Sequence, residues 1–199
     1  MSIRENIAHI NQLKAEAAQR SGRSGEDVLL VAVTKLHDVD EINEAIDCGI
    51  TDIGENKVQE IMDKYEHVKP VRWHLIGHLQ TNKVKYIIDK VDMIQSVDSL
   101  RLAAVIDEHC AKAGKVMDVL VQLNMGEEEN KFGIPPKETA EFLRKISSYR
   151  NICVRGLMGV VPHSDNTELT KKYFLQLYNI FLARGRQRRC PRSMTVRLY

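Results

Sequence analysis

Strand-like apolar runs alternate with helical segments six times along this chain, and this alternation limits the folds that the chain can adopt. The runs lie near residues 28–34, 50–53, 72–76, 91–97, 117–124 and 152–158. Each is followed by apolar residues at helical spacing, over about 38–48, 56–67, 80–89, 99–113, 136–148 and 167–182. Strands that alternate with helices in this way predict parallel strands joined by crossover helices, which is an α/β fold.

Two parallel architectures fit this alternation, an open doubly wound sheet and a (β/α)8 barrel of the TIM type. A doubly wound sheet usually has a glycine-rich turn after its first strand, but here the first run ends in Thr34-Lys35-Leu36-His37. A barrel gathers its functional groups at the carboxyl ends of several strands. Polar residues do follow these runs, at Lys35, Gly54-Glu55-Asn56, Gly77-His78, Ser96, Asn124 and Pro162-His163. The sequence therefore favours the barrel.

Helix boundaries can also be predicted. Apolar residues at helical spacing predict a helix over 3–20, before the first strand. Asp38 and Ser99 precede later helical segments and are predicted N-caps, whereas Gly49 and Gly114 are predicted helix stops.

Composition indicates an ordinary globular protein of the reducing cytosol. The chain has 199 residues, of which 43% are hydrophobic and 28% charged, enough for one sizeable core. It has no apolar run long enough to cross a membrane and no signal-peptide core at its start. Its four cysteines form no C-x-x-C pair. We therefore expect a cytoplasmic protein without disulfides or a membrane anchor.

The end of the chain differs in character from the rest. Residues 183–199 hold six arginines and no acidic residue, and without them the formal net charge of +2 would be −4. This segment also lacks helical periodicity. We interpret it as an alternative end of the chain, such as a shifted reading frame produces, rather than a nucleic-acid patch. The predicted domains are a barrel domain over 1–182 and an arginine-rich tail over 183–199.

Lys35 is the first candidate for chemistry. The apolar run that it ends predicts a strand buried on both faces of a parallel sheet, with the amine at the rim of the core. A lysine shielded there from bulk water loses its proton more easily and can attack a carbonyl carbon. A solvated lysine at a strand end is the alternative.

Metal and phosphate motifs give no competing site. His74 and His78 are four residues apart, but they straddle a predicted strand end and would not share a helix face. The chain has no Walker A motif and no G-x-S-x-G motif. We therefore predict no metal site.

Five segments carry a specific resemblance to a known family. They are Val31–Lys35, Ile53–Glu60, Trp73–Lys83, Gln122–Asn124 with Lys131–Gly133, and Arg155–Met158. Together they resemble the pyridoxal phosphate homeostasis proteins, from the first helix to about residue 182. The resemblance implies a barrel like the N-terminal domain of bacterial alanine racemases, without that enzyme's second domain. It also implies binding of pyridoxal 5'-phosphate (PLP), a role in vitamin B6 balance, and no established catalysis.

The resemblance also implies roles for four residues. Lys35 matches the lysine that holds PLP as a Schiff base, and Asn56 matches an asparagine near the cofactor. Lys131 matches a basic position where alanine racemases carry an arginine, and Met158 is expected to pack in the pocket. A solvated loop lysine, a helix cap and plain core packing remain the alternatives for Lys131, Asn56 and Met158. No catalytic residue is predicted.

The chain departs from the family at its end. The family continues with a Ser-x-Gly-Met-Ser segment, a helix and a strand with an Arg-x-Gly pattern, and neither motif occurs here. We therefore expect a barrel that lacks its last two strand units and much of its phosphate cradle.

Three functions remain open. The first is a carrier of PLP that serves PLP-dependent apo-enzymes and is a monomer or a weak homo-oligomer, without nucleic-acid or membrane partners. The second is an amino-acid racemase, which needs two acid/base groups, the second usually a tyrosine of the absent domain. The third is a truncated form with weak or no cofactor binding. The sequence favours the carrier, which is not an enzyme.

Overall fold

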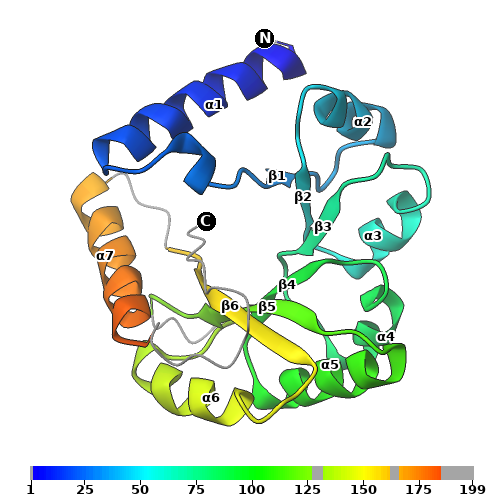
Figure 1. Ribbon diagram of the computed structural model, residues 1–199, viewed down its shortest axis with the longest axis vertical. Helices are drawn as coiled ribbons and strands as arrows, with labels where there is room; N and C mark the ends of the chain where they lie inside the picture. The colour runs from blue at the N-terminus through cyan, green and yellow to red at the C-terminus, as the bar shows by residue number, and fades with distance from the viewer. Residues whose placement is uncertain (1, 127–131, 162–165, 185–199) are drawn as a thin grey trace.

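Six strands and seven α-helices alternate along residues 2–126, 132–161 and 166–184, the part of the chain that this computed structural model describes (Figure 1). The strands are β1 (Ala32–Val33), β2 (Asp52–Glu55), β3 (Arg72–Leu75), β4 (Met93–Val97), β5 (Met117–Leu123) and β6 (Ile152–Gly159). The helices are α1 (Ile3–Arg20), α2 (Val39–Asp47), α3 (Val58–Lys64), α4 (Val84–Ile87), α5 (Leu100–Ala113), α6 (Thr139–Ile146) and α7 (Thr167–Arg184). Short 3-10 turns lie at Gly25–Asp27, Thr81–Lys83 and Pro136–Glu138.

The sheet has the strand order of a barrel. All neighbouring strands are parallel, and their order in the sheet, β1-β2-β3-β4-β5-β6, is their order in the sequence. In a doubly wound sheet the order of the strands reverses at a switch point, and in this sheet the order does not reverse. Figure 1 shows the strands as a curved wall around the middle of the molecule, with α2 to α6 outside it. The predicted barrel class is confirmed, with six strand–helix units in the described residues.

The main core lies between the convex face of the sheet and the outer helices. Buried side chains of the strands, such as Ile53, Ile94 and Val121, share one cluster with Ile61 of α3 and Ile106 of α5. Each of these five is fully or almost fully buried. Burial of an aliphatic side chain stabilises a fold by about 1.5–3 kcal/mol, so this cluster fixes the helices on the sheet.

The helix boundaries follow the local sequence signals. Asp38 accepts a hydrogen bond from the Glu41 N–H, and Ser99 accepts one from the Leu102 N–H, so both predicted N-caps are confirmed. Gly114 ends α5 at φ 64°, and Gly49 follows α2 at φ 100°, as the predicted stops require.

The first strand differs from the prediction. β1 has two residues instead of the seven expected over 28–34, and Val33 is 48% exposed. In the part of the chain that the structure describes, β1 pairs with β2 alone, so it is an edge strand. The prediction of a strand buried on both faces is wrong, since residues 28–32 are only half-buried and Val33 is exposed. At the open edge of a sheet, water reaches the strand from the side that has no neighbour.

The concave face of the sheet carries polar side chains as well as apolar ones. Side chains alternate along a strand, so Asp52 and His74 point away from the core that contains Ile53 and Trp73. His74 Nε2 lies 2.9 Å from Asp52 Oδ1, and Gln95 Nε2 lies 2.7 Å from His74 Nδ1. Since an amide nitrogen only donates, His74 accepts at Nδ1 and donates from Nε2.

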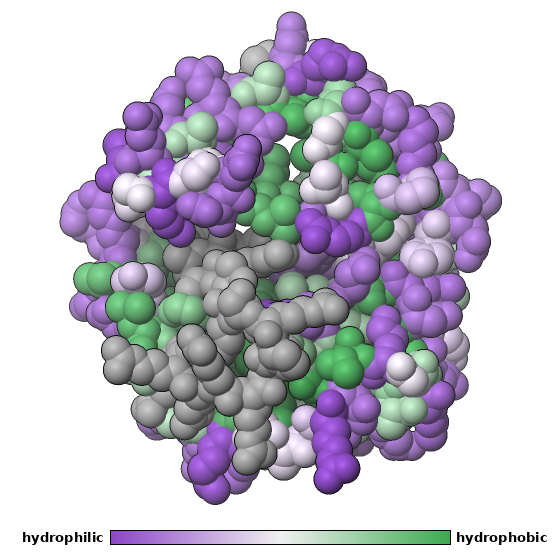
Figure 2. All heavy atoms as spheres, in the orientation of Figure 1, coloured by the Kyte–Doolittle hydropathy of each residue, from purple (hydrophilic) through white to green (hydrophobic). Residues whose placement is uncertain are grey.

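The surface agrees with this layered arrangement. Figure 2 shows hydrophilic residues over most of the periphery of one face and hydrophobic residues nearer its middle. Among the helices of the described residues, none is both long and apolar enough to cross a bilayer.

Asp52 makes the stability of the fold depend on pH. Burial raises the pKa of Asp52, but hydrogen bonds from His74, Arg72 and Thr51 outweigh burial and lower the pKa from 3.8 to about 2. The ionised carboxylate therefore stabilises the fold fully above pH 3.8, and this contribution is lost as the pH falls through about 2. It amounts to about 2 kcal/mol in full and to about 1 kcal/mol between pH 5 and pH 3.

Urea unfolding at several pH values checks this prediction. Between pH 5 and pH 3, the free energy of unfolding of the wild type should fall by about 1 kcal/mol more than that of Asp52→Asn. Equal losses in both proteins would contradict the stabilising role of the Asp52 carboxylate.

Candidate functional site

Polar residues from several strands meet at the carboxyl rim of the barrel wall. Because all six strands are parallel, the residues that follow them lie at the same end of the sheet. Lys35 follows β1, Asn56 follows β2, His78 follows β3 and Asp98 follows β4. Asn124 follows β5. Pro162 and His163, which were also expected at this rim, lie outside the described residues.

Lys35 stands on a tight turn directly after β1. Its side chain is exposed, and its ammonium makes no hydrogen bond or ion pair with any residue that the structure describes. The expected position at the strand end is confirmed, but the expected shielding from water is wrong in the described structure. The reason is that β1 ends at Val33, so Lys35 lies on an exposed turn outside the strand.

Asn56 lies half-buried in the loop between β2 and α3. Helix α3 begins at Val58 with Lys57 as its N-cap residue, and that cap has no side-chain hydrogen bond. Asn56 is therefore not the helix cap that the alternative interpretation required. The loop after β3 packs directly on it, because a Cβ atom on Gly77 would lie only 2.2 Å from Asn56 O.

His78 links the loops that follow β3, β4 and β5. Its Nδ1 atom lies 3.1 Å from Asp98 Oδ2. Its ring stacks on the ring of Phe132, with 3.6 Å between centroids and 11° between planes. The backbone after Phe132 is held to β5, since Asn124 N donates to Ile134 O at 3.0 Å. Sequence analysis singled out His78 but missed Asp98 and the stacked ring. Lys131, the predicted basic residue of this loop, lies outside the described residues.

Met158 is buried on the concave face near the end of β6. It forms a small cluster with Met93 of β4 and Leu120 of β5, separate from the main core. Met158 therefore packs against other apolar side chains and also lies just below the carboxyl rim. The expectation that Met158 lines a cofactor pocket stays a prediction.

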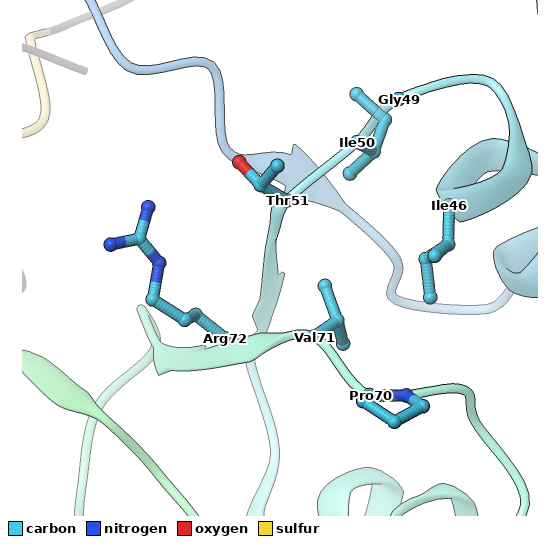
Figure 3. Close-up of a pocket in the computed structure, with 7 residues that line it drawn as sticks. All are labelled: Ile46, Gly49, Ile50, Thr51, Pro70, Val71 and Arg72. Carbon is cyan, nitrogen blue, oxygen red and sulfur yellow. The ribbon is translucent and has the colours of Figure 1, made fainter.

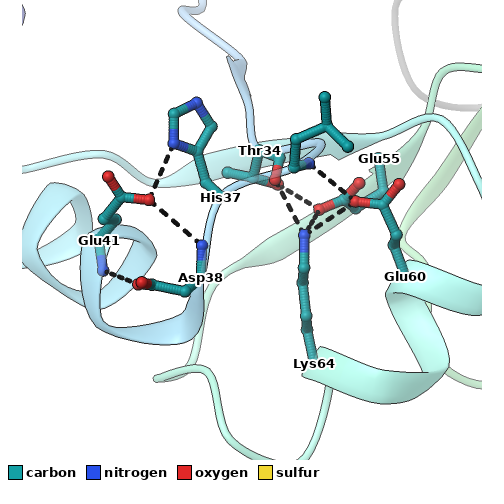
Figure 4. Close-up of polar contacts among 8 residues, drawn as sticks. Thr34, His37, Asp38, Glu41, Glu55, Glu60 and Lys64 are labelled. Atoms are coloured by element: carbon teal, nitrogen blue, oxygen red, sulfur yellow. Dashed lines mark hydrogen bonds and ion pairs between the residues drawn. The ribbon is translucent and has the colours of Figure 1, made fainter.

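A largely buried ion-pair network contacts the residues on both sides of Lys35, and Figure 4 shows its members Glu55, Glu60 and Lys64 beside Thr34. Lys64 Nζ lies 2.7 Å from Glu55 Oε1 and 3.1 Å from Glu60 Oε2, and it donates to Thr34 O at 2.9 Å. Glu55 is fully buried, and its Oε2 atom has no hydrogen-bond partner in the described part of the chain. Sequence analysis missed Lys64 and Glu60, although their spacing of four residues in a helix was a visible signal.

The charges of this network are stable. Burial lowers the pKa of Lys64, but its hydrogen bonds to Glu55 and Glu60 outweigh burial and hold that pKa above its ordinary value. The Leu36 N–H donates to Glu60, which lowers the pKa of that carboxyl below its ordinary value, and Lys64 adds to the effect. Lys64 therefore remains an ammonium near neutral pH.

A surface depression lies at the opposite end of the described sheet (Figure 3). Its walls come from the end of α2 and the segments just before and at the start of β2 and β3, and are formed by Ile46, Gly49, Ile50, Thr51, Pro70, Val71 and Arg72. It contains none of the predicted site residues. The described residues also contain no group of three His, Cys, Asp or Glu side chains that could hold a metal ion.

Comparison with known proteins agrees with this geometry. Residues 8–194 match the family model of the alanine racemase N-terminal domain. A pyridoxal phosphate homeostasis protein of Pasteurella multocida is 34% identical over 185 residues, which cover 91% of this chain and 79% of the relative. Another, from Aquifex aeolicus, is 37% identical over 179 residues, covering 89% and 78%.

A solved structure gives the same result. PipY of Synechococcus elongatus, whose structure has PLP bound, is 28% identical with a TM-score of 0.82, covering 99% of this chain and 87% of PipY. The fold and the rim residues thus define a barrel of the alanine racemase N-terminal class. The chain belongs to the family of pyridoxal phosphate homeostasis proteins.

Gly77→Ala tests how closely the two loops at this rim must approach. Gly77 is not in the left-handed region, so the cost comes from the close approach to the Asn56 backbone, whose O, Cα and C atoms would lie 2.2, 2.8 and 2.9 Å from the new Cβ. We expect destabilisation of about 2 kcal/mol or more. Gly49→Ala is the matched control. At Gly49 no atom lies within 4 Å but φ is 100°, so we expect about 1 kcal/mol from backbone strain. Thermal unfolding measures both, and a smaller loss for Gly77→Ala would contradict the close approach.

Proposed function

We propose that this chain binds PLP through a Schiff base with the amine of Lys35 and serves the intracellular homeostasis of this cofactor. The observation that carries the proposal is the exposed Lys35 amine at the carboxyl rim, without a partner in the described residues. The names of the curated relatives and the PLP in the PipY structure support it.

The chemistry expected of Lys35 is simple. Bound at this rim, PLP supplies an aldehyde whose carbon is open to attack by an amine. Lys35 must first lose a proton, and its neutral amine would then add to that carbon. As the carbon–nitrogen double bond forms, both remaining amine hydrogens would leave with the carbonyl oxygen as water. Exposure of Lys35 to water favours the reverse step as well, which suits a protein that holds the cofactor and gives it up.

The other predicted residues fit roles around this amine. Asn56 is half-buried at the end of the neighbouring strand, where its amide can both donate and accept hydrogen bonds. Met158, with Met93 and Leu120, offers an apolar floor below the rim on the concave face. Lys131 precedes Phe132, which stacks on His78 at the same rim, and we propose that it adds positive charge there.

The proposed role is binding rather than turnover. Racemisation needs an acid/base group on each face of the substrate, and alanine racemases of this barrel type take the second, a tyrosine, from another domain. The proposed recipients are PLP-dependent apo-enzymes of the cytoplasm, and the proposed state is a monomer or a weak homo-oligomer.

Lys35→Ala should abolish the covalent adduct. With PLP added to the wild type, we expect a visible absorption band that borohydride reduction converts to a stable adduct on the peptide containing Lys35. Lys57→Ala is the matched control, because Lys57 is an exposed lysine in the next strand's loop, and it should keep the band. An adduct that persists in Lys35→Ala at the wild-type level would overturn the assignment.

A direct assay separates the binding protein from the racemase. The wild type with saturating PLP should exchange L- and D-alanine no faster than PLP alone. The reason is that racemisation needs two acid/base groups, and the proposed site assigns that role to no residue besides Lys35. Chiral chromatography of timed samples measures the exchange. Exchange of the alanine isomers above the PLP background that disappears in Lys35→Ala would contradict the carrier role and favour the racemase.

A further inference from the structure

The turn that carries Lys35 has a backbone conformation that its own residues do not favour. His37 N donates to Thr34 O at 3.2 Å and closes a four-residue turn, with Lys35 second and Leu36 third. Leu36 has φ 67°, a conformation that glycine ordinarily supplies at the third position of such a turn. Its side chain is 87% exposed, so packing does not hold it. Such a conformation persists only where surrounding contacts fix it.

The residue before Lys35 is fixed by β2 and α3. Thr34 N donates to Gly54 O at 3.0 Å, and Thr34 Oγ1 donates to Glu55 Oε1 at 2.8 Å. Lys64 Nζ donates to Thr34 O at 2.9 Å. All three polar atoms of Thr34 therefore have partners, and Thr34 is itself buried.

The residue after Lys35 is fixed by α3 alone. Leu36 N donates to Glu60 Oε2 at 3.0 Å, and the same carboxylate oxygen lies 3.1 Å from Lys64 Nζ. Lys64 therefore bonds directly to Thr34 O on one side of Lys35. On the other side it bonds to Glu60, which in turn accepts from Leu36 N. Figure 4 shows the Lys64 side chain rising from α3 towards Thr34, with dashed lines from its amine to Thr34, Glu55 and Glu60.

We infer that Lys64 is a positioning residue that fixes the backbone on both sides of Lys35 and so aims the Lys35 amine at the carboxyl rim. This inference rests on the proposed function of Lys35. The division of roles between the two lysines follows from their contacts. Lys64 is 12% exposed and uses its three N–H donors on Thr34 O, Glu55 and Glu60. It has no donor left for a ligand, whereas the Lys35 amine makes no contact of this kind in the described structure.

Lys64→Met is the main test variant, because methionine fills a similar volume without the charge or the donors. Lys69→Met is the matched control, since Lys69 pairs with Asp47 at 2.6 Å on an exposed surface away from this turn. Glu60→Ala removes the acceptor of Leu36 N together with one of the three acceptors of Lys64. Glu60→Gln keeps an acceptor oxygen without the charge. These two variants carry the test if Lys64→Met does not fold.

The first measurement needs no cofactor. Amide hydrogen exchange, followed by NMR, reports how firmly Leu36 N–H is held by Glu60. We expect exchange of this amide to accelerate about tenfold or more in Lys64→Met and Glu60→Ala, and to stay near the wild-type rate in Lys69→Met and Glu60→Gln. Unprotected exchange of Leu36 N–H in the wild type, or equal rates in all variants, would overturn the inference.

The second measurement uses PLP and borohydride trapping. We expect the equilibrium constant for adduct formation on Lys35 to fall about tenfold in Lys64→Met, because the competent turn becomes a minor population. Glu60→Gln should recover most of the loss seen in Glu60→Ala, which general destabilisation would not produce. Equal trapping in Lys64→Met and wild type would overturn the positioning role and leave the proposed function intact. Absence of trapping in the wild type would overturn the proposed function. The hydrogen-exchange experiment would still test whether Lys64 and Glu60 fix the turn around Lys35.

Discussion

The ammonium of Lys64, held between the carboxylates of Glu55 and Glu60, is the contact on which the geometry of the rim depends. Burying an ammonium is costly unless it is paired and fully hydrogen-bonded, and here its three donors all have acceptors. The ion pair between Lys64 and Glu55 joins α3 to β2, and the hydrogen bond from Lys64 to Thr34 O reaches the residue just after β1. Removing one partner would leave a buried charge uncompensated, so this short edge strand keeps its turn only while the network is complete.

The parallel barrel explains why the candidate site lies at this end of the sheet. Each crossover helix returns the chain to the same starting edge, so loops from distant parts of the sequence meet at the carboxyl rim. The opposite half of the concave face is occupied by Asp52, Arg72 and His74. The Asp52 carboxylate pairs with Arg72 and accepts a hydrogen bond from His74. Those residues stabilise the barrel interior, whereas the rim keeps an amine without a partner in the described structure.

Local signals were enough to predict most of the fold. Helical spacing, the caps at Asp38 and Ser99 and the glycine stops depend on residues within one turn of each other. The burial of β1 could not be read in this way, because it depends on which strands lie beside it. For the same reason the exposure of Lys35 was predicted wrongly. The bond from Lys64 to Thr34 spans 30 residues, and only the fold reveals it.

The measurement that tests the central claim most directly is a crystal structure of this chain soaked with PLP. We predict electron density continuous from Lys35 Nζ to the cofactor, with Leu36 N still bonded to Glu60 and Lys64 still bonded to Thr34 O. Density for PLP at another lysine, or a Lys35 turn released from Glu60 and Lys64 while the cofactor is bound, would contradict the account.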